Sequence, residues 1–323
     1  MKKILRLFIA GICVLLILKA SAFGWKLFAP YIVFVEIRDS ALPVNLKSHV
    51  RQLSETIGNR SVYEYEKLQQ AANYIVEQFK SYGYRVEFQE YTVWGKKFKN
   101  IIAAKRGAMA PEEIIVVGAH YDSCDNPGAD DNASGVAGLL ELARVFSDKV
   151  SGRTIEFVAF VNEEPPFFKT EAMGSLVYTR SSKSRQKDIK AAIVLEMIGY
   201  YSNAFNSQRY SMILGLFYPN RGNFITAVGD LKSRSLNKDI ARAFKKRSVF
   251  PIESISLGFV PGADFSDHWA FWQEGYPAVM ITDTAFLRNY NYHNNLDTIE
   301  KLNFDYMANV IEGLVSAIEV IAR

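Results

Sequence analysis

The stretch EEIIVVGAHYDSCDNPGADDNASGVAGLLELARVF, residues 112–146, decides the fold. Residues 113–119 form a continuous apolar run rich in β-branched side chains, which is typical of a strand buried on both faces. Residues 134–146 have the periodicity of a helix. Between them, residues 120–135 carry one histidine and four aspartates. So much negative charge at the end of a buried strand requires a neutralising partner.

Strand and helix patterns alternate along the chain. The expected strands are residues 85–94, 100–104, 113–119, 154–162, 191–198, 209–217 and 278–282. The expected helices are residues 61–82, 134–146, 171–181, 224–246, 265–274 and 304–321. This alternation predicts an α/β fold, with a mixed, largely parallel central sheet and helices on both faces. Folds of this kind place their sites at the carboxyl ends of the strands.

The first residues have the order of a secretory signal. A basic start is followed by the apolar run of residues 7–18 and then by the small residues 20–22. Because an uncleaved leader could also anchor the chain, residues 1–22 are expected to be a signal peptide or a membrane anchor. We expect an exported protein, either periplasmic or secreted, or held at the membrane. Residues 23–60 are predicted to be an irregular segment, and residues 61–323 to form one large domain.

Charge and cysteine content narrow the function classes. The chain carries 38 basic and 34 acidic residues, and residues 1–22 hold four of the bases and no acid, which leaves 38 − 4 = 34 of each. A neutral mature domain gives no reason to expect a nucleic-acid partner. Cys13 lies in the leader, so Cys124 is the only remaining thiol and no disulfide is expected. Nothing in the composition predicts an oligomeric state.

Polar side chains follow several of the expected strands. They are His120, Asp122, Asp130 and Asp131, then Glu163 and Glu164, then Glu196, and in late loops Asp267, His268 and His293. Carboxylates that converge on one buried point repel each other and become protonated unless cations bind. Histidine nitrogen with carboxylate oxygen, without thiolate, suits catalytic zinc. The pattern therefore predicts two bound cations.

Six motifs occur in a fixed order from about residue 60 to the end: HYDS, GADDNASG, NEE, LEMIG, SDH and YHNNLDT. In this order the sequence resembles the M28 family of zinc peptidases, which includes leucyl-type aminopeptidases. The resemblance implies a zinc-exopeptidase fold with two zinc ions per chain.

The resemblance also assigns roles to individual residues. The implied metal ligands are His120, Asp131, Glu164, Glu196 and His293. Asp131 would bridge the two ions, Glu164 would complete the site of His120, and Glu196 would complete that of His293. Glu163 would be the general base, and Asp122 would support His120. Many relatives carry aspartate at the position of Glu196, so the geometry and occupancy of that metal site stay open.

The implied function is a zinc-dependent exopeptidase, most simply an aminopeptidase. It would hydrolyse N-terminal peptide bonds of a peptide or aminoacyl substrate through a metal-bridging hydroxide, with Glu163 taking the proton. Three alternatives stay open: a single-zinc enzyme like glutaminyl cyclase, a carboxypeptidase-type specificity, and a non-catalytic ectodomain of the same fold. The carboxypeptidase alternative needs a cation facing the substrate carboxylate, and Arg288 is the only arginine near the late motif.

Other residues have simpler interpretations. His49 is expected at the surface, His268 is expected to be structural, and Cys124 is expected to be a loop thiol near the pocket. Asp130 is expected to point towards the backbone amides of the following helix. The resemblance also implies a cis peptide between Asp130 and Asp131. Phe286, Tyr290 and Tyr292 are candidates for a pocket rim.

Overall fold

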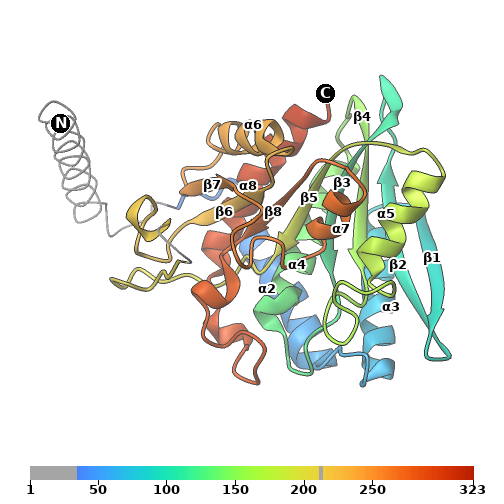
Figure 1. The fold of residues 1–323 in the computed structure, drawn as a ribbon, viewed down its shortest axis with the longest axis horizontal. Coiled ribbons are helices and arrows are strands. Elements are labelled where there is room, and N and C mark those ends of the chain that lie inside the picture. The colour runs from blue at the N-terminus through green and yellow to red at the C-terminus, as the bar shows by residue number, and fades with distance from the viewer. Residues whose placement is uncertain (1–34, 211–213) are drawn as a thin grey trace, which may run out of the picture.

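A computed structural model of the chain describes residues 35–210 and 214–323 (Figure 1). The expected leader, residues 1–22, lies outside the described residues. Within these two ranges no helix has the length and hydrophobicity that a membrane crossing requires.

The core of the molecule is one eight-stranded sheet with the order β1-β2-β4-β3-β5-β8-β6-β7. The strands are β1 (Val86–Val93), β2 (Lys96–Lys105), β3 (Ala110–His120), β4 (Arg153–Phe160), β5 (Asp188–Glu196), β6 (Ile225–Gly229), β7 (Ile252–Ser256) and β8 (Ala278–Thr282). Strand β3 runs parallel to both β4 and β5, and β5 runs parallel to β8, as β6 does to β7. The pairs β1–β2, β2–β4 and β6–β8 are antiparallel. The predicted mixed, largely parallel sheet is confirmed.

Helices cover both faces of this sheet (Figure 1). They are α2 (Leu42–Arg51), α3 (Tyr65–Ser81), α4 (Gly135–Ser147), α5 (Gly174–Ser184), α6 (Arg234–Phe244), α7 (His268–Gln273) and α8 (Phe304–Ile321). Alternate side chains of β3 point to opposite faces. Ile115 and Val117 join the larger core with α3, α4 and α8, whereas Val116 joins a second core with Tyr178 of α5 and Phe271 of α7. Both faces of β3 are therefore dry, which explains its continuous apolar run.

The segment predicted to be irregular, residues 23–60, contains regular structure in its described part. Helix α2 is followed directly by the wider helical turn Gln52–Ile57. Leu46, Val50 and Leu53 are fully buried, because their spacing forms an apolar stripe that packs on α4 and α8. The expectation for His49 was also wrong, since it is 5% exposed and its Nδ1 lies 2.6 Å from the Tyr74 hydroxyl.

The predictions for two other elements were also wrong. The helix expected at residues 224–246 divides into β6 and α6, because the apolar start pairs with β7 and β8 while only the basic part forms a helix. The strand expected at residues 209–217 is not formed in its described part, where Leu214–Leu216 is a 3-10 turn. Strand β7 was not expected at all, although it forms one edge of the sheet.

Candidate metal centre

The site lies where β3, β4 and β5 end. His120 is the last residue of β3 and Glu196 the last of β5, and Glu163 and Glu164 follow β4 by a few residues. Because these strands are parallel neighbours, their carboxyl ends meet at the same edge of the sheet. The loop after β3 adds Asp131, and the loop after β8 adds His293. The structure therefore brings together all five predicted ligands and the predicted base.

One half of the site is built around His120. Its Nε2 lies 3.2 Å from Glu196 Oε2 and 3.4 Å from Asp131 Oδ1, and Glu163 Oε2 is 3.9 Å away. The imidazole is 1% exposed. Burial disfavours its charged form, but the charges of Glu196 and Glu163 outweigh burial and raise the pKa of His120 well above its ordinary value. This imidazole is surrounded by negative charge in a dry environment.

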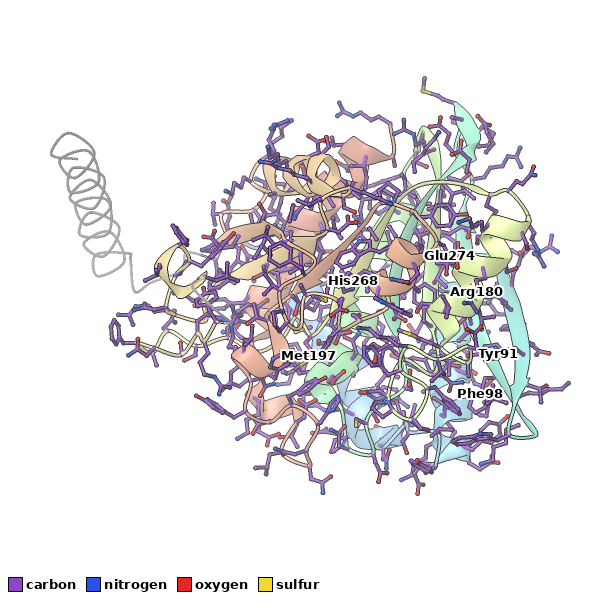
Figure 2. The ribbon with its side chains drawn as sticks, viewed as in Figure 1. Tyr91, Phe98, Arg180, Met197, His268 and Glu274 are labelled. Atoms are coloured by element: carbon purple, nitrogen blue, oxygen red, sulfur yellow. The ribbon has the colours of Figure 1, made fainter. Side chains whose placement is uncertain are left out.

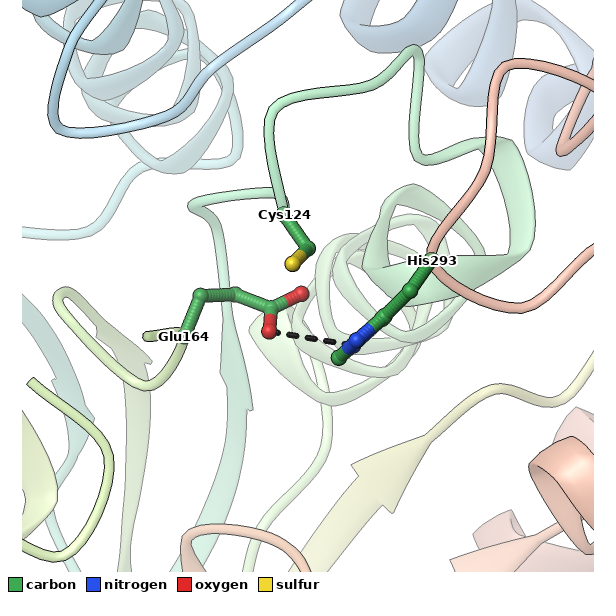
Figure 3. A group of neighbouring side chains, drawn as sticks. All are labelled: Cys124, Glu164 and His293. Carbon is green, nitrogen blue, oxygen red and sulfur yellow. Dashed lines mark ion pairs between the residues drawn. The ribbon is translucent and has the colours of Figure 1, made fainter. Parts of the chain in front are cut away.

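The other half is built around His293 (Figure 3). Its Nε2 lies 3.2 Å from Glu164 Oε2 and 3.2 Å from Asp131 Oδ2. The Cys124 sulfur joins this group, because one ligand atom each of Cys124, Glu164 and His293 lie within 4.8 Å of one another. The His293 side chain is 28% exposed, so this half opens to solvent. The expectation that Cys124 is a loop thiol beside the pocket was incomplete, since the thiol faces a ligand pair.

The pairing of ligands differs from the expectation. Glu196 Oε2 lies 3.2 Å from His120 Nε2 and Glu164 Oε2 lies 3.2 Å from His293 Nε2, whereas the prediction paired Glu164 with His120 and Glu196 with His293. Glu164 also lies within 4.8 Å of His120 and Glu163. The reason is the sheet order: β3 and β5 are direct neighbours, so the last residues of these strands meet. Glu164 lies in the loop after β4, and its carboxylate meets His293 of the loop after β8.

Asp131 lies between the two halves, with one oxygen towards each histidine. Burial opposes its ionisation, but the two imidazoles beside it, those of His120 and His293, outweigh burial and lower the pKa of Asp131. Its carboxylate is therefore placed to serve two cations at once.

The two glutamates after β4 have raised pKa values. Burial, followed by repulsion from Asp131, raises the pKa of Glu164 to about 8. Burial also raises the pKa of Glu163 well above its usual range, and the charges of Glu164 and Glu196 add to the effect, whereas His120 opposes it. Without added positive charge, the only way to relieve this repulsion is to protonate the carboxylates.

Asp122 holds the segment that carries these glutamates. Its carboxylate accepts hydrogen bonds from the backbone N–H groups of Glu163 at 3.2 Å and Glu164 at 3.0 Å. The same carboxylate lies 3.6 Å from His120 Nδ1, and the Asp122 carbonyl lies 3.2 Å from that nitrogen. One residue thus orients the histidine of one half and the glutamates of both.

Asp130 and Asp297 fix the loop that carries Asp131. The Asp297 carboxylate accepts from the backbone N–H of Asp130 and of Asp131, both at 3.0 Å. Asp130 itself accepts from Gly199 N–H and from the Asn289 amide, so the expectation that it braces the start of the following helix was wrong. The cis peptide lies one bond later than expected, between Asp131 and Asn132. Asp297, in the YHNNLDT motif, received no role from the sequence.

Three neutral side chains brace the same strand ends. Asn132 donates to the Leu195 carbonyl and accepts from the Met197 N–H, which ties the loop after β3 to the end of β5. Ser266 donates to Glu196 Oε2 at 2.7 Å. His268 is fully buried, and its Nε2 lies 2.8 Å from the Ala263 carbonyl, consistent with the expected structural role. Met197 and His268 lie near the middle of the molecule (Figure 2).

Arg60 holds the backbone of the loop that leads from His120 to Asp131. No role was predicted for this residue from the sequence. Its guanidinium is fully buried and donates to five backbone carbonyls, those of Leu53, Gly58, Tyr121, Pro127 and Gly128. Burial lowers the pKa of Arg60 to about 10. The arginine clamps both ends of the loop between His120 and Asp131. No periodicity or motif marks such a residue, because its partners are carbonyls that are contributed by the fold.

A cavity opens directly beside Glu196. Its rim includes Phe286 and Tyr292, as expected, whereas Tyr290 is exposed and packs against Arg209. Burial and the nearby carboxylates Asp131 and Glu164 raise the pKa of Tyr292, so its hydroxyl stays protonated. Arg288 does not face this space. It is 1% exposed, donates to Gln208 and the Tyr200 carbonyl, and so is not placed to meet a substrate carboxylate.

The donor set fits zinc. His120 Nε2 and Glu164 Oε1 are buried and have no hydrogen-bond partner among the described residues. Buried polar atoms are normally paired, so such orphans mark a missing partner. Each half offers one imidazole nitrogen and carboxylate oxygens, the ligand type of catalytic rather than structural zinc sites. Bound cations would pair these atoms and neutralise the excess of carboxylates.

Comparisons with known proteins agree with this geometry. Residues 100–318 match the sequence model of the family described as Peptidase family M28. The uncharacterized protein YfbL of Escherichia coli (strain K12) is 42% identical, and the match covers 85% of this chain and 87% of the relative. A probable leucine aminopeptidase of Trichophyton verrucosum is 27% identical over 81% of this chain and 68% of its own.

Solved structures share the fold. A zinc aminopeptidase from Bacillus subtilis superposes with a TM-score of 0.70 at 17% identity, covering 87% of this chain and 95% of its own. A glutaminyl cyclase from Bacteroides thetaiotaomicron superposes with a TM-score of 0.65 at 18% identity, covering 88% of this chain and 99% of its own. At such identities the likeness shows the fold alone.

Proposed function

Because the chain belongs to peptidase family M28 and is a metallopeptidase, we propose that it is a zinc-dependent aminopeptidase that binds two zinc ions. The observation that carries the proposal is the pair of histidine–carboxylate groups that share Asp131. The relatives named as leucine aminopeptidases support an aminopeptidase. The buried position of Arg288 removes the cation that a carboxypeptidase would need.

The proposed ligands follow the geometry. His120, Glu196 and Asp131 would hold the first ion, and His293, Glu164 and Asp131 would hold the second. Cys124 is a further available donor beside the second ion. When bound, two zinc ions lower the pKa of a water molecule towards ~7 and polarise the scissile carbonyl.

The chain supplies the proton transfers. Glu163 accepts a proton from the attacking water and delivers it to the leaving amine, so that water and amide become a carboxylic acid and an amine, which ionise to carboxylate and ammonium. The Glu163 carboxylate lies 3.9 Å from His120 Nε2 without being assigned to a metal, so it is available for this transfer. Asp122 keeps Glu163 in position through its backbone N–H. Tyr292 lines the cavity beside Glu196, and its protonated hydroxyl is the candidate donor to the substrate carbonyl.

We also propose that the protein is exported. The basic and apolar order of residues 1–22 supports export, with the leader either cleaved or kept as an anchor. A fractionation of cells that produce the full chain, followed by N-terminal sequencing, tests both forms.

One assay tests the proposed activity. We expect purified protein to contain two zinc ions per chain and to release nitroaniline from aminoacyl nitroanilides. Chelation should abolish this release, and added zinc should restore it. One zinc together with cyclisation of N-terminal glutamine would instead establish the cyclase, whose fold is shared. Absence of both metal and hydrolysis would overturn the proposal.

A further inference from the structure

The cavity beside Glu196 ends on a second carboxylate, that of Glu253. The sheet register places the two acids in one row. Glu196 of β5 is opposite Thr282 of β8, Thr282 is opposite Thr226 of β6, and Thr226 is opposite Glu253 of β7. Residues opposite each other in neighbouring strands point to the same face. The floor of the cavity is therefore a polar row that runs from the metal centre to the edge strand.

The walls of the cavity are apolar. They come from the loop over β7, from the segment before β6 and from the rim, and include Leu214, Val260, Phe265, Phe286 and Tyr292. Together with the solvent at its open mouth, the cavity contains about 810 Å³ of space not filled by atoms. Such walls accept an aliphatic chain, whereas the row of polar residues beneath them offers hydrogen bonds.

Glu253 has an unused carboxylate. The nearby hydroxyls of Tyr210 and Tyr218 donate elsewhere, to the carbonyls of Pro219 and Ser254. Burial raises the pKa of Glu253, and the only group that opposes this effect is the charge of Lys245, with no hydrogen bond contributing. A half-buried carboxylate that pairs with no side chain in residues 35–210 and 214–323 is a site for a cation from outside.

Thr226 gives an independent indication. Its Oγ1 is buried and has no hydrogen-bond partner among the described residues, although Thr226 lies next to Glu253 in the row. The residue is 7% exposed, so water has little access to that hydroxyl. Two neighbouring polar groups, one neutral and one acidic, thus lack partners at the far end of an apolar cavity.

We propose that this cavity takes the side chain of the first substrate residue and that Glu253 makes it select lysine or arginine. This inference rests on the proposed aminopeptidase function. The aliphatic stem packs against the walls, and the terminal cation donates to Glu253, with Thr226 beside it. Glu253 is a specificity-determining residue and takes no part in the reaction at the metals.

The dimensions fit this assignment. Three strand spacings of about 4.8 Å place the Cα atoms of Glu196 and Glu253 roughly 14 Å apart. A lysine side chain extends over five single bonds of about 1.5 Å each, or roughly 6 Å from Cα to Nζ. The remaining distance between the two Cα atoms is filled by the side chains of Glu196 and Glu253 and by the reacting carbonyl of the substrate. A leucine side chain ends well short of Glu253.

The test compares substrates that differ only in the terminal charge. Nitroanilides of lysine, Nε-acetyl-lysine and norleucine share one aliphatic stem. We expect kcat/KM for lysine to exceed that for the other two by roughly 10- to 100-fold, the range for a hydrogen bond to a charged group. Glu253→Gln should bring the ratio to near one while changing norleucine turnover less than about twofold. Glu87→Gln, on the opposite edge strand β1, is the matched control and should leave the ratio unchanged.

Two outcomes separate this inference from the proposed function. If norleucine or leucine is hydrolysed at least as well as lysine by the wild-type chain, the inference fails while the aminopeptidase stands. If no substrate is hydrolysed, the proposed aminopeptidase function is wrong. The affinities of the zinc-loaded chain for lysinamide and norleucinamide, measured by calorimetry, then test the cation site separately. Tighter binding of lysinamide supports the cation site, and equal binding overturns it. Because these measurements use wild-type protein, they hold even if Glu253→Gln does not fold.

Discussion

The two histidines of the metal centre are held by different kinds of structure. His120 ends the central strand β3 and is 1% exposed, whereas His293 lies in a loop with a φ of 57° and its side chain is 28% exposed. Strand pairing alone brings His120 to Glu196. His293 reaches Glu164 only because several loops fold over one another.

This difference shows which half of the site depends on supporting contacts. The His120 half inherits its geometry from β3 and β5, which are paired along their length. The other half depends on side chains that pin loops, such as Arg60 and Asp297. We expect the strand-borne half to be rigid and costly to disturb, and the loop-borne half to be adaptable.

The largest effect should come from Glu163, because it and its neighbour Glu164 have separate tasks. Glu163→Gln should lower kcat/KM by ~10²–10⁴-fold, since the proton acceptor is lost, while zinc content stays the same. Glu164→Gln is the contrast, because it removes a ligand on the His293 side and should lower zinc content. Metal analysis alongside the rate measurement distinguishes the two, and equal zinc loss in both variants would contradict the assignment.

Replacing each histidine by alanine compares the halves directly. In the metal-free chain, His120→Ala should cost about 3–5 kcal/mol, because it leaves buried carboxylates without a counter-charge. His293→Ala should cost about 1 kcal/mol, since its surroundings are partly solvated. Urea unfolding in the presence of a chelator measures both. Similar losses for the two variants would show that the strand-borne half is no more rigid than the other.

Replacing Arg60 tests how far the loop between His120 and Asp131 depends on the hydrogen bonds that Arg60 donates to its backbone. Arg60→Met should cost about 3 kcal/mol of unfolding free energy, because buried carbonyls lose their donors. Arg51→Met is the matched control, since Arg51 is exposed and its ion-pair partner among the described residues is the equally exposed Glu55, and it should change stability by less than about 0.5 kcal/mol. Zinc affinity on the Cys124 side should fall in the Arg60 variant, as titration with a competing chelator would reveal.

The effect that is smallest at neutral pH concerns His268, two residues after Ser266. Burial lowers the pKa of His268 to about 4. In the unfolded chain this histidine becomes protonated near pH 6.5, whereas in the folded chain it stays neutral down to about pH 4. The free energy of unfolding therefore decreases as the pH drops from about 6.5 to 4, by up to ~1.4 kcal/mol per pH unit. His268→Gln should flatten this part of the profile. Identical slopes in the two proteins between pH 7 and pH 5 would disprove the role.

The fold was predictable to the extent that each segment carried its own pattern. Strand β8 and helix α8 have the predicted bounds, because each reads as one uninterrupted pattern. Helix α2 was missed since its apolar stripe is diluted by polar residues that face solvent. The segment around β6 was misread as helix because a short buried strand and the start of a helix look alike in periodicity.

The site was predictable in its members but not in its partnerships. The motif order identified His120, Asp131, Glu163, Glu164, Glu196 and His293. The pairing of Glu196 with His120 follows from the sheet order, which the motifs do not contain. Arg60, Asp297 and Ser266 went unassigned because each acts through contacts between segments far apart in the chain.

The sequence by itself determined the donor types, the strands that deliver them and the need for cations, because charge and apolar patterning are local properties. Only the tertiary structure decided which donors lie side by side, that Cys124 lies beside Glu164 and His293, and that Glu253 lines the same cavity as Glu196. These depend on strand order and loop closure, which arise from packing between distant segments and leave no trace in any single stretch of the chain.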